Sequence, residues 1–309
     1  MASSKVVILG TGGTIAGTAA SATDAVGYAA AQLGVAQLVA AVPALASRSL
    51  ECEQVAQLDS KDMDHATWQR LAQRAAHHLA RPDVAGVVVT HGTDTLEETA
   101  YLLHRVLAPA KPLVLTAAMR PATALMTDGP QNLLDAVTVA LDAQAGGVVV
   151  AFGGRVWAGA EVRKVHTYRI DAFAAGDAGP LATVEEGSVR WSRAAPKTQA
   201  LGLAAIAADP ARWPRVEIVL NHAGAGGMLV DALVAQGVQG VVVAGTGNGA
   251  VHHVLEAALL RAQGAGVRVL RSTRCASGPV IGEAALPSAG ALTAVQARVE
   301  LMLQMLPTE

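Results

Sequence analysis

Aromatic residues are scarce in this chain of 309 residues: phenylalanine, tryptophan and tyrosine together make up only 3% of it. The core must therefore be built from aliphatic side chains, which the 52% share of hydrophobic residues supplies. Charged residues are also few, at 16%, and this composition excludes an intrinsically disordered chain. Abundant alanine and valine together with 31 glycines favour an α/β protein, with valine in buried strands and glycine in the turns.

The chain has only two cysteines, Cys52 and Cys275, which are far apart in the sequence and lack the spacing of metal ligands. We expect both to be ordinary reduced thiols. The formal net charge is -2 and no basic tract occurs, so we expect no nucleic-acid partner.

Long hydrophobic runs are missing as well, although the mean hydropathy is positive, at +0.37. Residues 146–160 are among the most apolar, but Arg155 and several glycines interrupt them before the roughly 18 apolar residues that a membrane span needs. Residues 1–5 lead directly into a strand-like run and carry no signal-peptide pattern. We therefore expect no membrane partner and a cytoplasmic protein, or a periplasmic one if a signal peptide has been removed.

Short valine-rich runs alternate with longer amphipathic segments, which is typical of parallel strands connected by helices. The expected strands are residues 5–9, 54–58, 84–90, 112–117 and 147–152, and later 216–220, 240–244 and 267–271. The expected helices are residues 64–80, 96–107 and 131–143, and later 227–236, 251–262 and 293–305. Asp64 is the expected N-cap of the first helix.

The alternating pattern weakens over residues 188–214, which contain several prolines and tryptophans. We predict a larger N-terminal domain over residues 1–190, with a doubly wound and mostly parallel sheet. A linker over residues 191–213 and a smaller C-terminal α/β domain over residues 214–309 would complete the chain.

Three segments rich in glycine and threonine follow expected strands, at residues 9–17, 89–95 and 243–249. Open parallel sheets bind their ligands at the carboxyl ends of the strands, where glycines let backbone N–H groups approach developing negative charge. The first segment lacks the last glycine of a dinucleotide fingerprint and the lysine of a phosphate-binding loop, so neither nucleotide site is predicted. Two pairs of adjacent histidines lie on expected helices, where neighbouring side chains point apart, and we do not expect them to bind a metal: His77-His78 and His252-His253.

A threonine hydroxyl in such a segment is a poor nucleophile until a base takes its proton. Lysine can be that base when desolvation or a nearby cation lowers its pKa, and an aspartate can orient it. Lys164 is the best candidate, although the sequence alone does not bring it to Thr93 and Asp94. The alternative is that these threonines only shape turns.

Several segments strongly resemble those of the bacterial-type L-asparaginases and glutaminase-asparaginases. The clearest are Thr11-Gly-Gly-Thr-Ile-Ala-Gly17, Tyr28 in Val-Gly-Tyr-Ala, and Thr90-His-Gly-Thr-Asp-Thr95. Further matches follow in order at residues 59–63, 118–121, 128–130 and 245–249, so the resemblance spans nearly the whole chain. It implies an L-asparagine amidohydrolase that works through a threonine-linked β-aspartyl ester and needs no metal or organic cofactor.

The resemblance also implies the catalytic residues. Thr14 would be the nucleophile, and Tyr28, on a mobile lid, would close on it and activate it. Thr93, Asp94 and Lys164 would transfer protons, and Asp94 would also meet the α-amino group of the substrate. Which threonine is activated by which base stays open.

The substrate-binding residues implied by the resemblance are Ser60, Lys61, Gly92, Ala118, Asn248 and Glu283. Ser60 and Gly92 would hold the α-carboxylate, while the N–H of Thr93 and the carbonyl of Ala118 would surround the side-chain amide. Asn248 and an acidic residue, for which we choose Glu283, would reach the pocket of a neighbouring subunit. The protein would then be at least a dimer, and by analogy with the family a homotetramer built as a dimer of dimers.

Lys61 departs from the family pattern, because glutamine or glutamate usually follows the serine and accepts a hydrogen bond from the substrate ammonium. A lysine ammonium only donates and would repel that group. Either Lys61 turns toward the carboxylate or the solvent, or the substrate binds differently. We hypothesise weaker binding of L-asparagine than is usual in the family.

Three other functions remain possible from the sequence. A glutaminase or dual glutaminase-asparaginase is the nearest, since one methylene discriminates only modestly between substrates. A non-catalytic amino-acid sensor would not need both threonines, the aspartate and the lysine. An amidase acting on aminoacyl-tRNA is disfavoured by the lack of an appended domain or basic tract.

Overall fold

The chain divides after Leu203 into two compact units, Met1–Leu203 and Ala204–Glu309. The computed structural model describes residues 5–307. The ends of the two expected domains, residues 1–4 and 308–309, therefore lie outside the described residues, as does most of the segment that we examined for a signal peptide.

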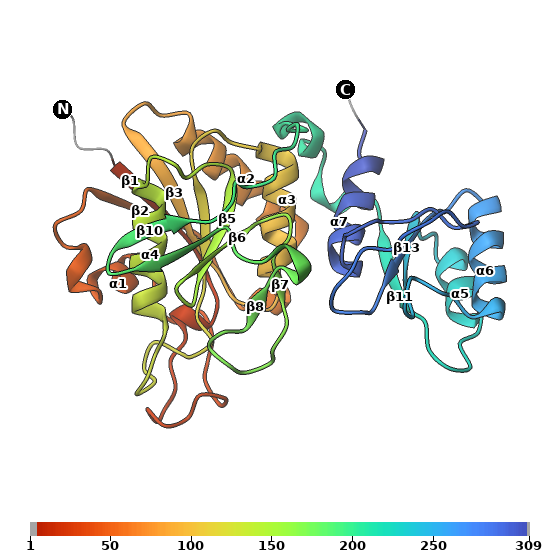
Figure 1. The fold of residues 1–309 in the computed structure, drawn as a ribbon, viewed down its shortest axis with the longest axis horizontal. Helices are drawn as coiled ribbons and strands as arrows, with labels where there is room; N and C mark the ends of the chain where they lie inside the picture. The colour runs from red at the N-terminus through yellow and green to blue at the C-terminus, as the bar shows by residue number, and fades with distance from the viewer. Residues whose placement is uncertain (1–4, 308–309) are drawn as a thin grey trace. The chain divides into compact units, whose positions relative to one another are not determined.

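An eight-stranded sheet forms the centre of the N-terminal unit, with the strand order β10-β9-β6-β5-β4-β3-β1-β2 (Figure 1). Five neighbouring strands are parallel: β1 (Lys5–Gly12), β2 (Leu50–Leu58), β3 (Val84–Thr90), β4 (Leu113–Thr116) and β5 (Val148–Phe152). Three antiparallel strands complete the sheet: β6 (Arg155–Ala158), β9 (Ala182–Glu185) and β10 (Ser188–Trp191). The central parallel strands are continuous aliphatic runs because helices bury both of their faces.

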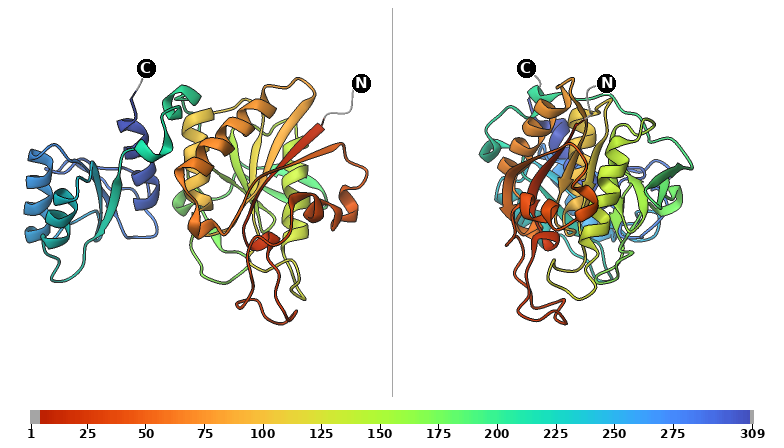
Figure 2. Two further views of the ribbon diagram at one scale, coloured as in Figure 1. Left: turned by 180° about the vertical axis from the view of Figure 1, so that it is seen from behind. Right: turned by 90° about the vertical axis from the view of Figure 1, so that its left-hand side faces the viewer.

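Helices cover both faces of this sheet, which makes it doubly wound (Figure 2). One face carries α2 (His65–Leu79) and α3 (Leu96–Leu107), and the other carries α1 (Val35–Ala40) and α4 (Gly129–Leu141). As predicted, Asp64 caps α2, because its carboxylate accepts a hydrogen bond from the N–H of Thr67 at 2.7 Å. A separate two-stranded ribbon pairs β7 (Arg163–Lys164) with β8 (Phe173–Ala174).

The C-terminal unit contains a parallel sheet of three strands, β11 (Val216–Leu220), β12 (Gly240–Gly245) and β13 (Arg268–Thr273). Helix α7 (Ala294–Met305) covers one face, and α5 (Met228–Ala235) and α6 (His253–Gly264) cover the other (Figure 1). No helix within residues 5–307 is both long enough and apolar enough to span a membrane.

Short 3-10 helices lie in the connections of both units. They are η1 (Thr14–Ala16), η2 (Pro43–Leu45), η3 (Ser60–Asp62), η4 (Gly176–Ala178), η5 (Leu203–Ile206) and η6 (Pro210–Arg212). Two of them, η1 and η3, begin at residues that the sequence marks as part of the site.

The predicted fold class is confirmed. Helix α1 was not expected, and strand β2 begins at Leu50 rather than at residue 54. The short strands β6 to β10 were not expected, and β10 falls where the sequence pattern weakens, because its residues alternate between half-buried and exposed. The expectation that the side chains of His252 and His253 point apart was wrong, because His252 is the N-cap of α6 rather than part of it, and the two rings stack with centroids 4.5 Å apart. Both cysteines are free and exposed.

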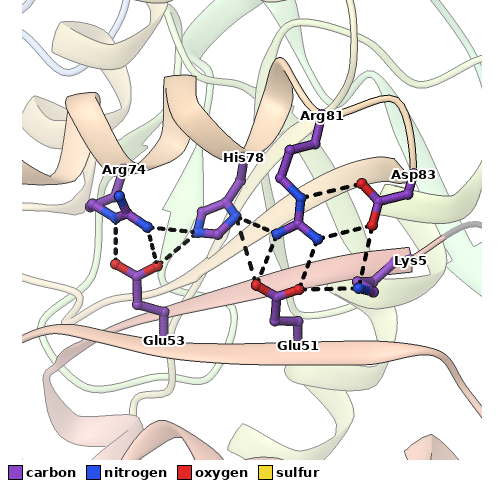
Figure 3. Close-up of polar contacts among 7 residues, drawn as sticks. All are labelled: Lys5, Glu51, Glu53, Arg74, His78, Arg81 and Asp83. Carbon is purple, nitrogen blue, oxygen red and sulfur yellow. Dashed lines mark hydrogen bonds and ion pairs between the residues drawn. The ribbon is translucent and has the colours of Figure 1, made fainter.

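Seven charged or polar side chains join β2 to the C-terminal end of α2, near the start of β1 (Figure 3). Buried His78 contacts the Glu53 carboxylate at 2.7 Å, and Arg81 pairs with Glu51 at 2.9 Å. The Arg81 guanidinium holds the pKa of Glu51 down to about 2. This network lies at the amino ends of the strands and holds α2 against the edge strand. Its other members are Lys5, Arg74 and Asp83.

Candidate active site

Two threonine segments meet at the carboxyl ends of β1 and β3. These strands are parallel neighbours, with Gly10 opposite Thr90, so the residues that follow them leave the sheet side by side. Gly13 lies directly against Gly92, and a Cβ atom on Gly13 would overlap the backbone of Gly92. The loops that carry Thr14 and Thr93 are therefore in backbone contact, which only glycine permits.

Thr14 begins η1 and is almost buried, and its hydroxyl lies 2.6 Å from the phenol oxygen of Tyr28. Either oxygen could be the donor in this hydrogen bond. Burial raises the pKa of Tyr28, so the phenol is neutral near pH 7. A neutral phenol can accept the threonine proton only while it gives up its own, so Tyr28 can pass a proton on but cannot by itself hold one taken from Thr14.

Tyr28 belongs to the segment 18–30, which is fastened to the segment 120–127. The N–H of Ala19 donates to the Thr123 hydroxyl at 2.8 Å, and the N–H of Leu125 donates to the carbonyl of Ala22 at 2.9 Å. The two segments lie next to one another below the sheet in the views of Figures 1 and 2. The position of Tyr28 over Thr14 therefore depends on both segments.

Thr93, Asp94 and Lys164 form a second cluster. The Lys164 ammonium donates to the Thr93 hydroxyl at 2.9 Å and to the Asp94 carboxylate at 2.7 Å. Thr93 is buried and Asp94 is exposed, so the ammonium bridges an interior hydroxyl and a carboxylate that faces solvent. Lys164 comes from β7, far along the chain from β3.

A buried chain of hydrogen bonds fixes the backbone of Gly92. The Nδ1 atom of His91 lies 2.7 Å from the Gly92 carbonyl, and its Nε2 atom lies 3.0 Å from the Thr99 hydroxyl. That hydroxyl accepts from the indole N–H of Trp68 at 2.8 Å. Burial lowers the pKa of His91 to about 4, so the ring is neutral, with Nδ1 as donor and Nε2 as acceptor. This chain was not predicted, although His91 stands inside the threonine motif.

Ser60 lies beside Gly92, and Asp128 holds the segment that follows Ala118. The hydroxyl of buried Ser60 accepts from the N–H of Asp94 at 3.2 Å, and Gly92 has no room for a side chain beside Ser60. The Asp128 carboxylate accepts hydrogen bonds from the backbone N–H groups of Met119 and Arg120, each at 3.0 Å. Asp128 is thus a supporting residue for which no role was predicted.

Lys61 follows Ser60 but its side chain is largely exposed, and its ammonium pairs with Asp62. This hydrogen bond, together with the nearby carboxylates of Asp62, Asp59 and Asp94, raises the pKa of Lys61. The lysine therefore carries its full charge near the rim of the site.

Asn248 and Glu283 belong to the C-terminal unit. The Asn248 side chain exchanges two hydrogen bonds with the backbone of Ile281, at 2.8 and 2.7 Å. Arg271 donates to the carbonyl of Gly282 at 3.2 Å. The exposed Glu283 therefore lies on a segment that Asn248 and Arg271 hold in place.

The cluster in the N-terminal unit offers hydroxyls, a phenol, a carboxylate and an ammonium, which suits nucleophilic attack followed by proton transfer. Within residues 5–307, no group of three or more histidine, cysteine, aspartate or glutamate side chains is placed to hold a metal ion. Seven residues predicted from the sequence meet at this edge of the sheet: Thr14, Tyr28, Ser60, Gly92, Thr93, Asp94 and Lys164.

Comparison with known proteins identifies both units. Residues 5–197 match the family model "Asparaginase, N-terminal", and residues 215–308 match the "Glutaminase/Asparaginase C-terminal domain". The chain is 38% identical to the glutaminase-asparaginase of Pseudomonas fluorescens biotype A, over 89% of this chain and 76% of that protein. It is 36% identical to L-asparaginase 2 of Escherichia coli K12, over 99% of this chain and 90% of that protein.

A solved structure shares the fold over nearly the whole chain. The crystal structure of a probable cytoplasmic L-asparaginase from Campylobacter jejuni superposes with a TM-score of 0.93 at 36% identity. The match covers 99% of this chain and 96% of that one. The chain therefore belongs to the asparaginase family of amidohydrolases.

Proposed function

We propose that this protein hydrolyses the side-chain amide of free L-asparagine to L-aspartate and ammonia, through a β-aspartyl ester on Thr14. The observation that carries the proposal is the pair of threonine hydroxyls at the carboxyl edge of the sheet, each with its own proton-transfer partner. Thr14 meets Tyr28 at 2.6 Å, and Thr93 meets Lys164 at 2.9 Å. Two threonine hydroxyls, each with its own proton-transfer partner, suit a reaction in two stages, in which an ester forms on one hydroxyl and is then hydrolysed.

In the first stage, the Thr14 oxygen attacks the amide carbon while its proton passes to Tyr28, whose own proton moves on toward the leaving nitrogen. The negative charge that develops on the amide oxygen would be stabilised by the N–H of Thr93. The carbon–nitrogen bond then breaks, ammonia leaves, and the β-aspartyl group remains on Thr14.

In the second stage, water attacks the ester carbon and gives a proton to the Thr93 hydroxyl, whose own proton moves to Lys164 while the Lys164 ammonium passes one on to the Asp94 carboxylate. The ester bond breaks, Thr14 regains a proton, and L-aspartate is released. The short contacts from the Lys164 ammonium to both partners support this role, since proton transfer needs groups within hydrogen-bond reach.

Substrate binding is proposed from the groups around the two threonines. Ser60 and Gly92 would hold the α-carboxylate, and the exposed carboxylate of Asp94 would accept the α-ammonium. The carbonyl of Ala118 would receive the amide N–H groups. Lys61 adds a cation at the rim, and we propose that it weakens the binding of the substrate ammonium.

The remaining proposals concern the assembly. Asn248 and Glu283 would complete the site of a neighbouring subunit, so the active form would be at least a dimer and by family analogy a homotetramer. We retain the domain boundaries of 1–190 and 214–309 around a linker as a proposal. Likeness to the chain described as a probable cytoplasmic L-asparaginase supports a cytoplasmic location.

A dual glutaminase-asparaginase is the second candidate. It is favoured by the 38% identity to a protein named glutaminase-asparaginase over most of the chain. The side chain of glutamine is one methylene longer, and a difference of that size discriminates only about 10- to 200-fold.

Ammonia release from L-asparagine and L-glutamine, measured for the wild type and for Thr14→Ala, tests the proposal. We expect rapid release from asparagine and loss of nearly all release in the variant, and the glutamine rate separates the two candidates. Binding of either amino acid by the folded wild type without any ammonia release would instead identify a sensor.

A further inference from the structure

Lys164 lies on a strand with little support of its own. Strand β7 has two residues and pairs only with β8 within the described residues. The N–H of Val165 donates toward β8, to the carbonyl of Ala172 at 2.8 Å. Because N–H groups alternate in direction along an extended strand, the N–H of Lys164 points to the other side of the ribbon.

Glu97 accepts a hydrogen bond from the N–H of Lys164. Its Oε1 atom lies 3.4 Å from the backbone nitrogen of Lys164, and its side chain is half-buried. Glu97 stands in the first turn of α3, three residues after Asp94. This hydrogen bond therefore links the strand that presents the ammonium directly to the helix that follows Thr93 and Asp94.

We propose that Glu97 is a positioning residue for Lys164, and that ionisation of its carboxyl group tightens the presentation of the ammonium to Thr93 and Asp94. The inference rests on the proposed function, in which these three groups transfer protons. Glu97 would act through Lys164 and not on the reacting atoms.

The surroundings of Glu97 make its ionisation sensitive to pH near neutrality. Burial is the main cause that raises its pKa to about 7, and the charge of Glu98 on the same helix raises it further. Arg163 and Lys164 on β7 act in the opposite direction. A carboxylate accepts a stronger hydrogen bond than a neutral carboxyl group, so the link to Lys164 strengthens above about pH 7 and weakens below it.

The first test needs no turnover. The chain has five lysines, so deuterated protein labelled only with ¹⁵N-lysine gives five backbone amide signals: Lys5, Lys61, Lys111, Lys164 and Lys197. The signal that disappears in Lys164→Arg is that of Lys164. We expect it to shift with a midpoint near pH 7 in the wild type and to lose this titration in Glu97→Gln.

Glu98→Gln is the matched control, because it makes the same chemical change one residue away. Its Lys164 signal should still titrate, with a midpoint at lower pH, since the charge that raises the pKa of Glu97 is gone. A Lys164 signal that does not titrate in the wild type, or that titrates equally in Glu97→Gln, would overturn the inference.

The second test is kinetic. The kcat of the wild type should fall about fivefold as the pH drops through 7, as expected for replacing a charge-assisted hydrogen bond by a neutral one. Glu97→Gln should show the low value on both sides of pH 7, with KM little changed. A purely structural role would not remove this inflection.

The two proposals fail in different ways. If the Lys164 amide titrates as expected but no ammonia is released by the wild type, the proposed function fails and the positioning contact stands. If ammonia is released and Glu97→Gln keeps the wild-type pH profile, the positioning role fails and the proposed function stands.

Discussion

Replacing Gly13 by alanine should lower both the stability and the turnover of this protein. Gly13 has φ 79° and ψ -172°, a backbone conformation that is essentially restricted to glycine. A Cβ atom at this position would also overlap the Cα and N atoms of Gly92. Since these are backbone atoms, the clash is relieved only if the loop that carries Thr93 moves.

The two effects can be separated with Gly179. This residue has nearly the same conformation, φ 67° and ψ -174°, and apart from Gly179 itself and its two chain neighbours no heavy atom lies within 4 Å of the position that its Cβ would take. Gly179→Ala should therefore cost only the backbone strain, about 1–3 kcal/mol. Gly13→Ala should cost the same strain plus about 1–3 kcal/mol for the overlap.

Urea denaturation at equal protein concentration, together with kcat for ammonia release, measures both effects. We expect Gly13→Ala to be less stable than Gly179→Ala and to lose about 100-fold in kcat, as misplacement of a reacting group by about 1 Å produces. Gly179→Ala should keep the wild-type kcat. Equal stability and equal kcat in the two variants would refute the argument that the Gly13–Gly92 contact places the two threonines.

Three further predictions follow from other contacts. Thr99→Val keeps the side-chain shape but leaves Nε2 of His91 and the indole N–H of Trp68 without this partner, which should lower the free energy of unfolding by about 2–6 kcal/mol in urea titrations. Lys61→Gln removes a cation from the rim and should lower KM for L-asparagine by up to about fivefold with kcat unchanged; an unchanged KM would show that Lys61 does not act on the substrate. The pKa of Glu51 in the folded protein, about 2, lies below its ordinary value of 4.5. The stabilisation from its ion pairs is therefore fully present above about pH 5 and is lost as the pH falls from about 5 to 2. Glu51→Gln should flatten this part of the stability profile, and an equally steep acid transition in the variant would contradict the assignment.

The sequence predicted the regular parts of the fold well because burial determines them. Strand β3, helix α3 and strand β11 have the expected bounds, since each is a run whose periodicity matches one type of element. The strands β9 and β10 were missed because they are short, mix polar with apolar residues and depend on pairing with one another. Hydrogen bonding between two short strands at the edge of a sheet leaves little signal in the hydrophobic pattern of either strand.

The residues of the candidate site also divide into those that local burial places and those that contacts between distant segments place. Thr14 and Thr93 could be placed at the carboxyl ends of strands because both follow buried parallel strands, but the sequence did not show that these two strands are neighbours. The contact of Lys164 with Thr93 could not be derived from local pattern, because it joins residues 71 positions apart through a ribbon of two short strands. The hydrogen-bond chain behind Gly92 was invisible for a similar reason: a buried histidine is recognised only when its partners are known.

The location of the acyl group tests the central claim most directly. The wild type would be mixed with isotopically labelled L-asparagine, quenched in acid during turnover, digested and mapped by mass spectrometry. We predict a labelled β-aspartyl group on the peptide that contains Thr14, at the threonine oxygen. Label on Thr93 instead, or no label on either threonine while ammonia is being released, would contradict the assignment of Thr14 as the nucleophile.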